Sequence, residues 1–225
     1  NVDLEYKRDS SKNRPKRSGG FTQAQTLITN GSNLDKLYFE NCSFVSRLNL
    51  LSLYIHTRAY FKDCHFESTD DSLATGKITV YENCDFDLYS GTPCATSSDY
   101  LQSFLGCTFN LKWTNGGITL SKGLTNFAFI DCIFNGPLSK AEYKQNSVPL
   151  ETRGILYNNK HVIDGNSQDL IFTATQPESS IILTELNLKA FKIQNQYNVY
   201  NLLNKSGLST WDPNNQASSM ITSPW

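Results

Sequence analysis

Three segments near the start of this 225-residue chain repeat one six-residue phrase: Phe39-Glu-Asn-Cys-Ser-Phe44, Phe61-Lys-Asp-Cys-His-Phe66 and Tyr81-Glu-Asn-Cys-Asp-Phe86. Each copy reads aromatic, any residue, Asn or Asp, Cys, any residue, Phe. Two looser copies follow at Phe104–Phe109 and Phe129–Phe134, and the cysteines of successive copies are 20 to 25 residues apart. A period of this length predicts a stacked repeat architecture.

Strand chemistry dominates the repeat. It is rich in Phe, Tyr, Val, Ile and Thr, with turn residues between the copies, which is typical of β-strands. The period is too short for a pair of helices and fits one turn of a parallel β-solenoid. Within the phrase, Cys and the final Phe share a face because side chains alternate along a strand. A bend at the Asn or Asp, residues that tolerate left-handed backbone, would bring the first aromatic to the same side.

The predicted fold is therefore all-β: a right-handed parallel β-helix with internal ladders of Phe, Cys and Asn. A β-sandwich whose strands resemble one another is the alternative. We expect a basic N-terminal segment over residues 1–20, β-helix rungs over 21–137 and a C-terminal irregular or β extension over 138–225. The repeat period is absent from the last part, which we expect to cover the end of the β-helix or to start another module.

Charge and hydropathy narrow the range of partners. The formal net charge is −1, so no overall field favours nucleic acid or an anionic membrane. No apolar run reaches the length of about 18 residues that predicts a membrane span. Five of the six cysteines occupy the repeat position, and we expect free inward thiols there because Cys packs as a small hydrophobe. We expect a monomer or a part of a larger multi-domain chain.

Two neighbouring segments resemble a known family. Tyr60-Phe-Lys-Asp-Cys-His-Phe-Glu-Ser-Thr-Asp-Asp-Ser-Leu-Ala-Thr-Gly76, followed by Val80-Tyr-Glu-Asn-Cys-Asp-Phe86, is similar to the pectin methylesterase pattern Glu-Gly-Thr-x-Asp and then Phe-x-Asn-Cys. The chain also resembles the β-helix part of large Bacteroidetes carbohydrate-utilisation proteins, which carry Ser-Arg-Leu-Asn before Thr-Asp-Asp. The resemblance implies a pectin lyase-like right-handed β-helix, and a secreted protein located in the periplasm, at the cell surface or outside the cell.

The resemblance also implies a paired-aspartate mechanism. Asp71 takes the place of the family's nucleophilic aspartate, and Asp70 precedes it as a partner. One rung earlier the family has Gln-Asp, whose Asp is the general acid/base, and the matching residues here are Leu48 and Asn49. An amide cannot relay a proton as a carboxylate does, so we expect Asn49 to act as a polar orienter or an oxyanion donor. The family's later Gly-Arg-Pro-Trp motif has no counterpart.

Side chains near this pair supply the other candidates. An arginine keeps a carboxylate ionised or binds a uronate carboxylate in a bidentate manner, and Arg47 and Arg58 are the candidates for this clamp. Histidine carries protons because its unperturbed pKa is about 6.5, and aromatic rings stack on sugars. The predicted substrate-binding residues are Tyr54, His56, His65, Tyr89 and Trp113.

Two other functions stay open. A polysaccharide lyase would bind Ca²⁺, a hard ion that takes several oxygen ligands, through Glu67, Asp85 and Asp87 together with Asp70 and Asp71. A non-catalytic glycan-binding or scaffold module would grip an extended chain in a groove along the rungs. The principal prediction is a pectinesterase-like hydrolase that needs no cofactor or metal and acts on an acidic plant polysaccharide such as pectin.

Overall fold

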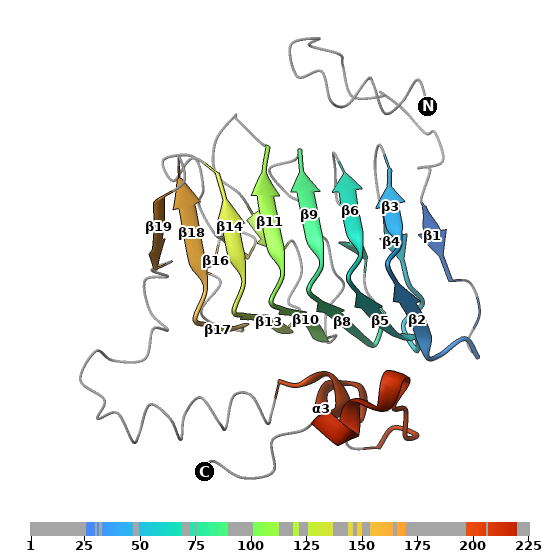
Figure 1. Ribbon diagram of the computed structural model, residues 1–225. Helices are drawn as coiled ribbons and strands as arrows, with labels where there is room; N and C mark the ends of the chain where they lie inside the picture. Colours follow the sequence, from blue (N-terminus) through green and yellow to red (C-terminus); the bar gives the residue numbers. More distant parts are fainter. Residues whose placement is uncertain are drawn as a thin grey trace, which may run out of the picture.

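The computed structural model shows strands stacked into a parallel β-solenoid, with very little helix (Figure 1). The structure describes residues 26–29, 31, 33–46, 50–68, 73–74, 76–89, 101–112, 119–121, 126–136, 144–145, 148–149, 154–163, 166–169, 197–205 and 207–219. The basic segment predicted over residues 1–20 lies outside these ranges. Each turn of the solenoid, called a level below, contributes one strand to each of two main sheets.

The first main sheet has six parallel strands, one per level. They are β2 (Leu37–Glu40), β5 (Arg58–Lys62), β8 (Ile78–Glu82), β10 (Leu101–Leu105), β13 (Asn126–Ile130) and β17 (Gly154–Tyr157). The register places the first aromatic residue of each phrase opposite that of the next. Phe39, Phe61, Tyr81, Phe104 and Phe129 therefore form one column.

The second main sheet has seven strands. They are β3 (Ser43–Val45), β6 (His65–Ser68), β9 (Asp85–Leu88), β11 (Thr108–Leu111), β14 (Ile133–Asn135), β18 (Lys160–Ile163) and β19 (Asn166–Asp169). The first six are parallel, whereas β19 runs antiparallel to β18 and ends the parallel progression. The final Phe of each phrase forms the second column, made of Phe44, Phe66, Phe86, Phe109 and Phe134.

Short strands between the second sheet of one level and the first sheet of the next form a third wall. β1 (Leu27–Ile28), β4 (Leu51–Ser52) and β7 (Leu73–Ala74) make a parallel three-stranded sheet. β12 (Thr119–Ser121), β15 (Lys144–Gln145) and β16 (Val148–Pro149) make a second one, in which β15 and β16 are antiparallel. Leu51 and Leu73 are buried in the core that the three walls enclose.

Each level turns from the first main sheet into the second at one residue with left-handed backbone. Its φ lies between 50° and 62° at all six levels, at Asn41, Asp63, Asn83, Gly106, Asp131 and Asn158. Asn, Asp and Gly adopt this conformation at the lowest cost. The bend predicted at the Asn or Asp of the phrase is confirmed. It explains why an aromatic residue three positions before Cys still faces inward.

The two aromatic columns fill the interior. Rings within a column are stacked at centroid distances of 4.8–5.3 Å, and the two columns meet mostly edge to face. Both geometries are favourable for aromatic pairs. Rings from the second level onward are fully buried, whereas Phe39 at the first level is half-buried.

The five phrase cysteines are free thiols, as predicted, and four of them are buried. From the second level on, each thiol lies within hydrogen-bond reach of a carbonyl on its own level and one on the preceding level. For Cys107 these acceptors are Leu105 O at 3.6 Å and Tyr81 O at 3.4 Å. The thiol therefore combines the packing of a small hydrophobe with a weak donor at the bend. The sixth cysteine, Cys94, lies outside the described residues.

The solenoid continues beyond the boundary predicted at residue 137. β17 and β18 pair in parallel with β13 and β14 and add a sixth level. The corresponding sequence is Leu156-Tyr-Asn-Asn-Lys-His161, in which Leu, Asn and His replace the first aromatic, the Cys and the final Phe. Because only the bend Asn is kept, the period of the phrase does not reveal this level.

Asn159 occupies the cysteine position of the sixth level. Its Oδ1 accepts a hydrogen bond from Cys132 N at 2.9 Å, and its Nδ2 donates to Phe129 O at 3.0 Å. The amide thus bonds to the carbonyl of the first phrase residue on the preceding level, as each phrase cysteine from the second level onward does. A polar residue is tolerated at this buried position because both ends of its side chain are paired.

The described part of the C-terminal extension lies on the side of the solenoid, whereas the sequence predicts a cover over its end or a new module. It contains α3 (Val199–Leu203), capped by the side chain of Asn198, and the 3₁₀ segment η3 (Pro213–Ser219). In Figure 1 these elements lie against the outer face of the six-stranded sheet, near β2, β5 and β8. Within the described ranges, no helix is long and apolar enough to cross a membrane.

Candidate functional site

The predicted residues that lie outside the described ranges are Arg47, Asn49, Asp70, Asp71 and Trp113. The structure nevertheless fixes the chain on both sides of the two segments that carry the first four. Before them, Ser46 N donates to Glu67 O at 3.0 Å. After them, Leu51 lies opposite Leu73 in the parallel pair β4 and β7. The two segments therefore leave from adjacent positions and arrive at adjacent positions, one level apart.

Arg58, the second candidate clamp for a uronate, binds a carboxylate of the chain itself. Its side chain is 1% exposed and contacts Asp35 through Nε at 3.1 Å and Nη2 at 2.6 Å. Nη1 donates to Leu203 O at 2.8 Å and Ser209 O at 2.7 Å, and Nη2 also reaches Ser209 Oγ at 3.0 Å. All five guanidinium N–H groups thus have acceptors within the chain. This arrangement does not favour Arg58 as a substrate clamp and leaves Arg47 as the candidate.

Two predicted sugar-binding side chains lie together after β4. The rings of Tyr54 and His56 are edge to face with centroids 5.6 Å apart, and His56 is exposed. Tyr54 N donates to Thr29 Oγ1 at 2.6 Å. A Cβ at Gly76 would lie 2.3 Å from Thr57 O, so only glycine allows this close approach of the next level. The turn that carries the two rings is therefore held from both neighbouring levels.

A second polar feature runs along the outer face of the seven-stranded sheet. It is formed by the residue after the final Phe of four successive phrases, namely Glu67, Asp87, Asn110 and Asn135. Asn135 Nδ2 donates to Asn110 Oδ1 at 2.9 Å, and Asn110 Nδ2 donates to Asp87 Oδ1 at 2.9 Å. These four residues, together with His65 and Asp85 beside them, are called the polar ladder below.

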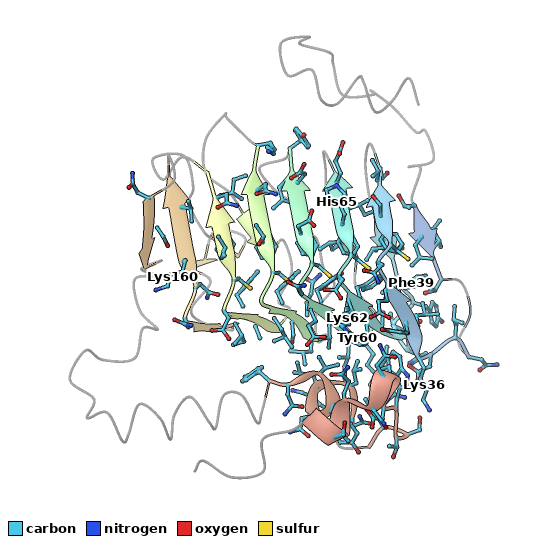
Figure 2. All side chains as sticks on the ribbon, viewed as in Figure 1. Lys36, Phe39, Tyr60, Lys62, His65 and Lys160 are labelled. Carbon is cyan, nitrogen blue, oxygen red and sulfur yellow. The ribbon has the colours of Figure 1, made fainter. Side chains whose placement is uncertain are left out.

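His65 and Asp85 lie opposite each other on β6 and β9. His65 Nδ1 is hydrogen-bonded to Asp85 Oδ2, with the side chains 33% and 51% exposed. A carboxylate in this position fixes the orientation of the imidazole ring. Figure 2 shows His65 on the seven-stranded sheet. Tyr89, half-buried, directly follows β9. The described sugar-binding candidates thus divide between this sheet and the turn of Tyr54 and His56.

Three side chains of the polar ladder could hold a metal ion. His65, Glu67 and Asp87 each offer a ligand atom, and these atoms lie within 4.8 Å of one another. Glu67 is 1% exposed. Ca²⁺ takes 6–8 oxygen ligands, whereas two carboxylates and an imidazole suit Zn²⁺ or Mn²⁺ better. Of the predicted calcium ligands, Glu67 and Asp87 come together, while Asp85 is bonded to His65.

Sequence reasoning misses Asn110 and Asn135 as site residues, although the phrase contains their signal. Every copy after the first is followed directly by Glu, Asp or Asn. Because the preceding Phe faces the core, the next residue faces outward. Parallel stacking in register then places these residues above one another, which predicts a continuous polar row.

Comparisons with known proteins add no relative. No family profile, no curated protein and no solved structure matches the chain. The stacked parallel sheets are compatible with a β-helix fold, and a functional assignment therefore depends on the geometry of the chain itself.

Proposed function

We propose that this protein is a carbohydrate-active β-helix that hydrolyses methyl esters of an acidic plant polysaccharide such as pectin, outside the cytoplasm. The observation that carries the proposal is the convergence of two segments on one short sheet. Residues 47–49 lead into β4, residues 69–72 lead into β7, and the two strands are paired in register. An extended polymer can lie along such a wall because equivalent positions repeat from level to level.

In the proposed reaction the carboxylate of Asp71 attacks the ester carbonyl carbon. Asn49 donates a hydrogen bond to the oxyanion that forms. Collapse of this intermediate releases methanol, which takes its proton from Asp70. In this proposal Asp70 carries the proton and Asp71 is ionised, as in a pair of carboxylates that share one site. Asp70 then takes a proton from water, the hydroxide cleaves the acyl-enzyme, and the free uronic acid and Asp71 are released.

Binding groups flank this centre in the proposal. Arg47 pairs with the carboxylate of an unesterified neighbouring uronate, because Arg58 has no N–H group left for it. Tyr54 and His56 offer an edge-to-face pair at the other end of β4, on which a sugar ring can stack. The substrate would then contact two adjacent levels of the third wall.

The test is methanol release from methyl-esterified homogalacturonan by the intact protein. We expect Asp71→Asn to lower the rate by about 1,000-fold or more, since a nucleophile is lost. The matched control, Asp85→Asn, removes one carboxylate from the polar ladder on another sheet and should leave the rate within about twofold. Loss of activity in the control but not in Asp71→Asn would contradict the proposed site.

The polar ladder favours a metal-dependent polysaccharide lyase as the second candidate. Its test uses demethylated homogalacturonan with and without added Ca²⁺, Mn²⁺ or Zn²⁺, and follows the absorbance of the unsaturated product. In this case Asp87→Asn abolishes the absorbance change and Asp71→Asn does not. If the protein binds homogalacturonan but releases neither methanol nor an unsaturated product, it is a non-catalytic glycan-binding module.

A further inference from the structure

Residues 197–219, called the strap below, are joined to the solenoid through the buried guanidinium of Arg58. Three residues accept its hydrogen bonds. Leu203 and Ser209 belong to the strap, and Asp35 precedes β2. Arg58 itself begins β5, so one side chain connects the first level, the second level and the strap. A buried cation without acceptors is strongly unfavourable. The contacts of Arg58 to Asp35 and to the strap should therefore form and break together.

Apolar packing extends the contact to the third level. One cluster contains Tyr60, Ile78 and Val80 of the sheet together with Val199, Leu202 and Leu203 of α3. The Trp211 ring centroid lies 5.7 Å from Arg58 Cζ, within range of a cation–π contact. Figure 2 shows Tyr60 on the side of the six-stranded sheet that faces the strap. The strap therefore covers apolar side chains of the six-stranded sheet that lie around the Arg58 guanidinium.

The first level lies at one end of both main sheets. Among the described residues, β2 and β3 are end strands with a neighbour on one side only. The strap adds contacts at this level: Lys36 Nζ donates to Thr210 O at 2.9 Å, and the Asn214 amide bonds to Tyr38 Oη. These bonds supply at the side what an interior strand receives from its second neighbour.

The strap is also held together internally. Asn204 Nδ2 donates to Tyr200 O at 2.8 Å and to Trp211 O at 2.6 Å, and Asn204 Oδ1 accepts from Trp211 N at 2.6 Å. One amide thus ties α3 to the chain that follows it. The part of the strap from α3 to Trp211 is therefore held together as one body.

We infer that the strap is a conformational device that controls the first two levels of the solenoid. When it is docked, Arg58 is paired and β2 is fixed against β5. When it is released, the first level loses its side contacts and Arg58 loses acceptors. Arg58 begins β5 and His65 begins β6 of the same level, on either side of the bend at Asp63, so release also loosens the N-terminal end of the polar ladder. This inference concerns order and does not depend on the proposed function.

The test is hydrogen exchange measured by mass spectrometry on the full chain. Arg58→Met removes the donors and keeps an apolar stem, and Leu202→Ala weakens the strap through a residue of the strap itself, with Arg58 unchanged. In both variants we expect amides of the strap and of β2 and β3 to exchange at least about tenfold faster than in the native chain. The exchange rates of amides in β11 and β14 should be unchanged. Lys205→Met, which removes an exposed cation from the strap, should behave as the native chain does.

Two outcomes would overturn the inference. Faster exchange in the strap with unchanged exchange rates in β2 and β3 would mean that the solenoid is ordered without the strap. Equal acceleration at all levels in Leu202→Ala would mean that the strap contributes to global stability alone. Absence of methanol release by the native chain would count against the proposed function and would leave the inference about the strap unaffected.

Discussion

Gly106 occupies a position that Asn or Asp fills at the other five bends. Its φ is 62°, and a Cβ at this residue would meet nothing within 4 Å. Asn tolerates left-handed backbone and restricts the unfolded chain more than Gly does. The strain of an Asn side chain in left-handed backbone offsets this entropic gain, so we expect Gly106→Asn to change the free energy of unfolding by less than about 0.5 kcal/mol, measured as a nearly unchanged urea midpoint with an unchanged m-value.

Gly106→Val is the matched comparison, because the space is equally open but the backbone is wrong for a β-branched residue. It should lower the free energy of unfolding by about 1–2 kcal/mol, the usual cost of left-handed backbone. If Asn and Val destabilise equally at this position, the left-handed bend is not what selects Asn, Asp and Gly in the phrase.

The buried cysteines make stability depend on alkaline pH. Burial raises the pKa of the Cys84 and Cys107 thiols above the unfolded value of 9.0. The folded chain therefore holds these protons more tightly, and the resulting stability is complete below pH 9.0 and is lost as pH rises beyond it. Urea unfolding between about pH 7.5 and 10 should show this decline.

A Cys84→Ala, Cys107→Ala double variant should be less stable at pH 7.5 and show a shallower decline above pH 9.0, the ordinary value of these thiols. Burial also raises the pKa of Tyr60 from 10.0, so the tyrosine contribution begins at higher pH and remains in the variant. An identical slope in the variant and the native chain would exclude the thiols as the cause.

Among the elements, the sixth level depends on one amide. Asn159→Ala leaves the buried Cys132 N without its acceptor, so we expect the free energy of unfolding to fall by about 1–3 kcal/mol. The control Asn166→Ala changes an exposed residue of β19 and should alter it by less than about 0.5 kcal/mol. Urea unfolding measures both, and equal small effects would mean that the sixth level adds little to the fold.

The same amide shows why the sequence predicts five levels and misses the sixth. The five phrases repeat both residue type and spacing, so stacking, bend and thiol ladder can be predicted from them. At the sixth level Asn159 performs with two strong hydrogen bonds what Cys performs with packing and weak ones. A repeat is recognised by recurring residue types, so a level in which Asn replaces Cys is not detected even though the two side chains have the same structural role. The two-residue strands of the third wall are likewise too short to carry a period.

Sequence reasoning about the site succeeds for pairs that are one repeat apart and fails for distant ones. His65 and Asp85 follow the cysteines of adjacent phrases, so register alone places them opposite each other. Arg58 is different because its acceptor Ser209 lies 151 residues away. No local pattern connects the two, and a lone arginine on a strand can serve a substrate or an internal carboxylate equally well.

At the scale of the whole molecule, levels contact mainly their neighbours, as expected of a solenoid. The strap departs from this scheme because it connects the first levels to residues 145 to 176 positions later. In such a stack an end level has a neighbour on one side only, and among the described residues the first level is one of these. The strap follows the sixth level in the sequence and returns to the first, so it couples the first levels to residues that come after the last described level.

The contribution of each aromatic ring to the free energy of unfolding should differ between the middle of the solenoid and its first level. Phe86 is fully buried, with ring contacts to Phe66, Tyr81, Phe104 and Phe109. Phe86→Ala should cost about 3–5 kcal/mol of unfolding free energy, the range for a large buried side chain. Phe39 is half-buried, and its ring contacts among the described residues are to Phe44 of its own level and Phe61 of the next, so Phe39→Ala should cost clearly less. Equal costs in urea unfolding would show that the first level is packed as tightly as the middle, and that the solenoid has no weak end for the strap to secure.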